Sequence, residues 1–102
     1  MATRLPEPQD RHQIDVDPKL LDGYVGRYRF SSEDLLAVTR KGGQLFVRRH
    51  GDLEMAVYPE SNLDFFAKAV DEQVTFKTDS TGRATELVFH ENGAIQRAKR
   101  IQ

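Results

Sequence analysis

The sequence contains no cysteine and no tryptophan among its 102 residues. Without cysteine the chain forms no disulfide framework, no thiolate zinc site and no redox pair. No apolar run approaches the ~20 residues of a membrane-spanning helix, and the polar N-terminus lacks the apolar core of a signal peptide. An excess of one charge is also missing, because 15 basic residues face 16 acidic ones. A nucleic-acid binder needs a basic face that displaces counterions, so we expect no nucleic-acid partner.

Catalytic motifs are equally scarce. There is no G-x-S-x-G and no S-x-x-K, the motifs that mark activated serine nucleophiles. The histidines His12, His50 and His90 have no second ligand at a metal-binding spacing, and there is no H-E-x-x-H. Serines and carboxylates gather in predicted turns, where backbone hydrogen bonding and solvation explain them. We therefore expect no catalytic residue, no cofactor and no metal, and the chain is predicted not to be an enzyme.

The chain has the length of one domain. Residues 1–16 are polar, include two prolines and are predicted to form an extended linker, so the domain spans 17–102. Such a linker is typical of a piece of a longer chain, although a free-standing protein can also have a loose N-terminus. Asp17, Pro18 and Gly23 suit the cap, the first position and the end of a helix, which predicts one short helix near 18–22.

After that helix, turn signals recur about every ten residues, a spacing typical of antiparallel all-β domains. Seven turns bound eight short strands, and the Asn-Gly pair suits a two-residue hairpin. The turns fall at 31–34, 42–43, 51–52, 59–62, 71–72, 79–82 and 92–93.

Alternation within the segments indicates which residues face the core. The faces of 85–89 and 94–98 stay open. Eight hairpin-linked strands hide both sheet edges by closing into an up-and-down barrel, with a split-sheet sandwich as the alternative. Because the strands are short, we expect side chains to fill most of the interior. The predicted inward residues are Leu45, Val47, Leu53, Met55, Val57, Val74 and Phe76.

Two places are candidate partner or ligand surfaces. Arg48, Arg49 and His50 form the densest basic spot, which could receive an acidic patch or a carboxylated ligand, or could be a solvated strand end. Phe65 and Phe66 are strand neighbours, so one fills the core and the other points outward. We take Phe66 as the outward ring, covered by a partner, by the N-terminal segment or by nothing.

A third cluster concerns barrel closure. Tyr24, Gly26 and Tyr28 share one face, and Gly26 allows a ring or a backbone to come close. The first and last strands of a closed barrel pair, which brings Arg100 to these residues. We expect the Arg100 guanidinium to pack against Tyr28 or Tyr24, a cation–π contact of roughly 0.5–2 kcal/mol. The competing interpretation leaves Arg100 frayed and solvated near the chain end.

Six short motifs occur together in the order of a known family. The chain resembles the lipocalin-like C-terminal domain, of unknown function, of β-lactamase-related and penicillin-binding-protein-like serine hydrolases. The resemblance covers roughly residues 14–101. The motifs are LDGYVGRY at 21–28, GGQLFV at 42–47, YPES at 58–61, FFAKAV at 65–70, VTF at 74–76 and GAIQRAKRI at 93–101.

The resemblance implies an eight-stranded lipocalin-like barrel and an accessory role beside a hydrolase, in active-site access or oligomer assembly. The partner would be the catalytic domain of the same longer chain or another copy. A piece of an exported hydrolase would be periplasmic or extracytoplasmic. Lipocalins carry G-x-W in the first strand, whereas Gly26-Arg27-Tyr28 places tyrosine there, and Arg100 would be their late arginine. The alternative function is a free-standing barrel that binds a small apolar or amphipathic ligand.

Overall fold

The computed structural model describes residues 12–102, so residues 1–11 of the predicted linker lie outside the described part. Residues 12–16 form neither helix nor strand, and the Ile14 N–H donates to the Pro59 carbonyl at 2.9 Å. The short helix α1 (Pro18–Asp22) follows, which confirms the prediction for this segment. Its cap residue Asp17 accepts a hydrogen bond from the Lys19 N–H at 3.0 Å. Within the described chain, no helix has the length and apolar character to cross a membrane.

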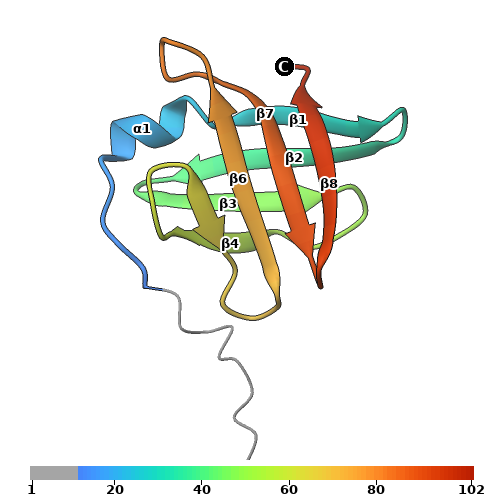
Figure 1. The fold of residues 1–102 in the computed structure, drawn as a ribbon, viewed down its shortest axis with the longest axis horizontal. Helices are drawn as coiled ribbons and strands as arrows, with labels where there is room; N and C mark the ends of the chain where they lie inside the picture. The colour runs from blue at the N-terminus through green and yellow to red at the C-terminus, as the bar shows by residue number, and fades with distance from the viewer. Residues whose placement is uncertain (1–11) are drawn as a thin grey trace, which may run out of the picture.

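Eight antiparallel strands follow α1 and close into a barrel in sequential order (Figure 1). The first and last strands pair through Tyr28 with Arg100 and Arg29 with Lys99. This closure confirms the predicted all-β up-and-down barrel, and the split-sheet sandwich is wrong. The strands are β1 (Gly26–Ser31), β2 (Asp34–Lys41), β3 (Gln44–Arg49), β4 (Met55–Pro59), β5 (Asp64–Phe66), β6 (Glu72–Thr78), β7 (Ala84–Glu91) and β8 (Ala94–Arg100).

Aromatic rings meet in the barrel interior. Tyr24 stacks on Phe76 with ring centroids 4.3 Å apart and nearly parallel planes. Phe65 meets both rings edge-on at 5.8 and 5.7 Å, an arrangement that aromatic quadrupoles favour. Leu21 of α1 is buried in the same cluster, so the helix packs against this end of the barrel. These three rings therefore pack against one another inside the barrel.

Burial shows which residues face the core in the two strands whose inward faces the sequence did not decide. In β7 the core residues are Ala84, Leu87 and Phe89, and in β8 the core residue is Ala98. Leu53 is a correction, because it was predicted to face inward and is 91% exposed. The Asp52 N–H donates to the Arg49 carbonyl in a turn, so β4 begins only at Met55 and Leu53 stays outside it.

Candidate functional site

One end of the barrel is held by Arg100 of β8. Its Nη1 donates to the carbonyls of Gly23 and Ala84, both at 2.9 Å, and its Nη2 donates to the Val25 carbonyl. The guanidinium carbon lies 5.8 Å from the centre of the Tyr28 ring. Arg100 therefore ties three chain segments together: the end of α1, the entry to β1 and the start of β7.

The other predicted closure residues lie around this guanidinium. The Tyr28 hydroxyl donates to the Tyr24 carbonyl at 2.8 Å, and the Tyr24 hydroxyl donates to the Asn62 carbonyl at 2.6 Å. A Cβ on Gly26 would lie 2.9 Å from Arg100 Nη2, so only glycine leaves room there. Burial raises the pKa of Tyr28 to about 12, although the positive charge of Arg100 opposes the shift. Tyr28 is therefore a neutral hydrogen-bond donor at physiological pH.

Arg49 of β3 lies at the opposite end of the barrel. Its Nε and Nη2 donate to the two oxygens of Asp34 at 3.0 and 2.6 Å, the bidentate geometry of a strong ion pair. The guanidinium carbon lies 4.4 Å from the Phe30 ring centre and 5.5 Å from that of Phe89. Glu91 approaches Nη1 at 3.7 Å. Arg49 is therefore engaged on the interior side and is not free to receive a partner.

The pKa values of two carboxyls near Arg49 are shifted in opposite directions. Hydrogen bonds from Arg49 lower the pKa of Asp34. Burial raises the pKa of Glu72, and a hydrogen bond with Glu91 adds to the shift. Sequence reasoning missed this cluster, although strand alternation already places Arg49 on the same face as the buried Leu45 and Val47. Grouping Arg49 with Arg48 and His50 on one surface was wrong for that reason.

Arg48 and His50 point to the outside instead, where they line a groove. The groove has a volume of about 340 Å³ and crosses β1, β2 and β3. Arg27 and Arg48 are both register partners of Ala37, so the three residues form one row across the sheet. The lining residues are Arg27, Leu35, Ala37, Thr39, Arg48, His50 and Glu54.

Phe66 is not the exposed ring that the sequence suggested, because only 6% of its surface is exposed. It lies outside the core cluster and meets the Tyr58 ring at 6.1 Å. The Lys68 ammonium sits 3.9 Å from the centre of the Tyr58 ring and donates to Gln13 at 2.8 Å. Phe66 therefore offers no free surface to a partner.

The described residues show no prepared catalytic centre. Within 12–102 no three histidine or carboxylate side chains gather where they could hold a metal ion. Ser61 donates to the Asp64 carboxylate at 2.8 Å and accepts from the Asp64 N–H at 2.9 Å, which is the hydrogen bonding of a turn. The groove and the polar clusters around Arg100 and Arg49 are thus the features for which a role is sought.

Fold and site together define a small closed β-barrel domain with one engaged arginine at each end. The chain belongs to the family described as Domain of unknown function (DUF3471), which matches residues 10–100. It is also similar to penicillin-binding protein 4* of Bacillus subtilis (strain 168), with 28% identity over 95 residues. The match covers 93% of this chain and 21% of the relative, so the chain spans about a fifth of that protein's length.

Proposed function

We propose that this domain is a non-catalytic accessory module of a serine hydrolase related to penicillin-binding proteins, and that it controls active-site access or oligomer assembly. The similarity to penicillin-binding protein 4* carries the proposal, because it spans nearly the whole chain and only 21% of the relative. A segment of that size that closes its own barrel is a domain beside a larger remainder. The nucleophile and its base would belong to that remainder.

The polar groups at the two barrel ends support a structural and binding role. Arg100 is occupied by backbone carbonyls, and Arg49 is occupied by the Asp34 carboxylate. A general base must itself be free to take a proton from substrate, and a nucleophile needs an adjacent base that activates it. These groups instead hold the ends of the barrel in place, which leaves the outer surface for recognition.

The lipocalin-like resemblance extends the proposal to the kind of barrel. The sequential strand order and the late Arg100 beside the first strand support that relationship. The alternative function, binding of a small apolar ligand, needs an open interior. Tyr24, Phe65 and Phe76 pack together there, so no observation favours this alternative.

The reading frame upstream of Met1 gives the first test. Codons for an S-x-x-K-bearing domain would support the proposal. An in-frame stop codon, together with no hydrolase that the chain binds, would contradict it.

The second test compares the full-length hydrolase with a form that lacks residues 12–102. We expect both forms to be labelled by a fluorescent penicillin, while the truncated form changes in KM for a D-amino-acid peptide or in oligomeric mass. Equal KM and equal mass would sink the proposal. The isolated chain should show no label and no ester turnover. Turnover that survives repurification and disappears on replacing one serine would equally refute it.

A further inference from the structure

The groove across β1, β2 and β3 combines an apolar floor with basic walls. Leu35 and Ala37 of β2 are half-buried and form the floor. Arg27 stands on one side of Ala37 and Arg48 stands on the other, because each is its register partner. Neighbouring strands lie about 4.8 Å apart, so the Cα atoms of the two arginines are separated by about 10 Å. His50 extends the β3 wall beyond Arg48.

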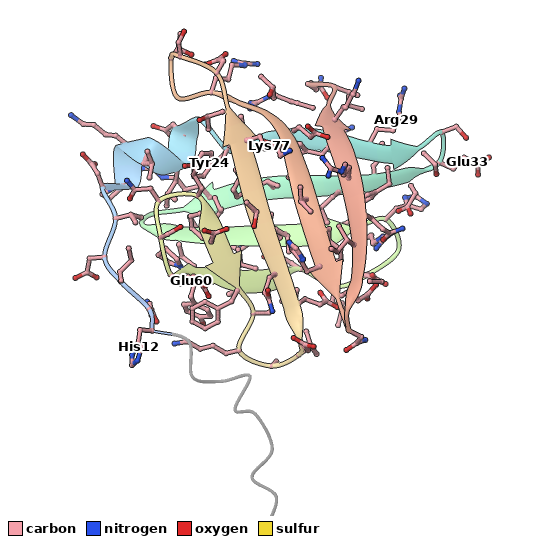
Figure 2. The ribbon with its side chains drawn as sticks, in the orientation of Figure 1. His12, Tyr24, Arg29, Glu33, Glu60 and Lys77 are labelled. Carbon is pink, nitrogen blue, oxygen red and sulfur yellow. The ribbon has the colours of Figure 1, made fainter. Side chains whose placement is uncertain are left out.

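The charges of these walls are not neutralised within the described part of the chain. No hydrogen bond or ion pair among residues 12–102 engages the side chains of Arg27 or Arg48, and both are exposed. Arg29 of β1 points to the outside of the barrel and adds a third cation opposite Leu35 (Figure 2). Glu54 is the acidic member of the lining, and Lys41 already pairs with it at 3.2 Å. The groove therefore presents free positive charge on both sides of an apolar strip.

We propose that this groove binds an extended acidic peptide segment of a partner protein. In this segment one carboxylate stands two residues before an apolar residue and another stands two residues after it. Alternate residues of an extended segment share one face, and each step of two residues advances about 6.7 Å. The apolar residue would pack on Ala37 while the carboxylates reach Arg27 and Arg48, whose planar forks bind carboxylates in pairs. A single small carboxylate would engage one wall and leave the other unpaired.

Recognition has to use side chains because the sheet is closed. Many peptides bind by adding a strand to an open sheet edge, and a closed barrel offers no such edge. The inference deepens the proposed function, since the catalytic domain would supply the segment. Binding to the groove is nevertheless a property of this chain alone and can be measured without a hydrolase.

The test is an NMR titration of the isotopically labelled full chain with the capped peptide Glu-Thr-Leu-Thr-Glu. The matched control peptide carries glutamine in place of both glutamates. We expect amide shifts confined to β1, β2 and β3, weaker binding at high salt, and at least fivefold weaker binding of the glutamine peptide. Equal binding of both peptides, or shifts spread over the whole cationic surface, would overturn the proposal.

Matched variants separate the groove from general charge attraction. Arg27→Ala and Arg48→Ala should each weaken binding about three- to fivefold, the effect of one exposed ion pair. Arg97→Ala removes the same charge from the exposed face of β8 and should change nothing. Equal losses in all three variants would refute a specific site. If the peptide binds but removal of the domain leaves the hydrolase unchanged, the groove proposal holds and the proposed function is wrong. If removal changes the hydrolase but the peptide does not bind, the proposed function holds and the groove proposal is wrong.

Discussion

Replacing Arg100 with alanine should destabilise the barrel more than a surface change does. The substitution removes donors from the carbonyls of Gly23, Val25 and Ala84. An unsatisfied buried acceptor costs about 1–3 kcal/mol, and water at the barrel end can re-pair these acceptors, so about 1 kcal/mol each is the appropriate estimate. Loss of the contact with Tyr28 adds about 0.5–1 kcal/mol. We therefore expect a loss of about 3–4 kcal/mol from a total stability of about 5–15 kcal/mol.

Urea denaturation measures this loss directly. With a slope of about 1–3 kcal/mol per molar urea, the midpoint of Arg100→Ala should fall by roughly 1–4 M. Arg100→Lys should recover about a third of the loss, because a compact ammonium reaches one of three carbonyls and cannot stack flat on a ring. Arg97→Ala on the exposed face of the same strand is the control and should stay within about 0.5 kcal/mol of the parent. If Arg100→Ala matches that control, Arg100 does not hold the end of the barrel.

Three further predictions concern the two ends of the barrel. Gly26→Ala drives a Cβ into the Gln102 carbonyl oxygen, so we expect a loss of about 1–3 kcal/mol in thermal unfolding, and an unchanged melting temperature would contradict this packing. Glu72 has a raised pKa from burial, so its ionised form disfavours the fold and stability falls as pH rises through the folded pKa. Glu72→Gln should thus raise the urea midpoint at pH 7 and match the parent below about pH 4. Asp34 has a pKa lowered by hydrogen bonds from Arg49, so its contribution is present above the unfolded pKa and is lost as pH falls through the folded one. Asp34→Asn should lower the urea midpoint at pH 7 and match the parent in strong acid. If Asp34→Asn and Glu72→Gln shift the midpoint in the same direction at pH 7, the opposite effects of these two carboxylates on stability are refuted.

Local signals predicted the strands well because hairpins are encoded by a few neighbouring residues. The Asn-Gly turn at 92–93 lies between β7 and β8, and Asn92 adopts the positive φ of 49° that such a turn requires. Closure was also predictable in outline, since sequential hairpins leave two edges that must meet. The Tyr28–Arg100 register pair is the physical result of that requirement.

The site was less predictable because it depends on contacts between distant segments. Arg48 and Arg49 look alike in sequence, yet alternation sends one to the outer groove and the other to Asp34 and Phe30 inside the barrel. The partner of Arg48 across the groove, Arg27, lies two strands away, and no local pattern fixes the register that sets both arginines opposite Ala37. The burial of Phe66 was not predictable because it rests on distant contacts. Phe66 meets the Tyr58 ring, which Lys68 covers while it donates to Gln13.

The short pairing of β4 with β5 has a consequence for how the barrel opens. These strands share two register pairs, Tyr58–Phe66 and Pro59–Phe65, as few as β1 and β8, whereas β6 and β7 share seven. Pro59 has no N–H to donate to its neighbour, and its carbonyl is bound from outside by Ile14. Amides of β5 should therefore exchange with solvent deuterium through local opening, while those of β6 and β7 exchange only on global unfolding. A pull on the chain ahead of α1 would act at Pro59, beside this short pairing, through the Ile14 hydrogen bond.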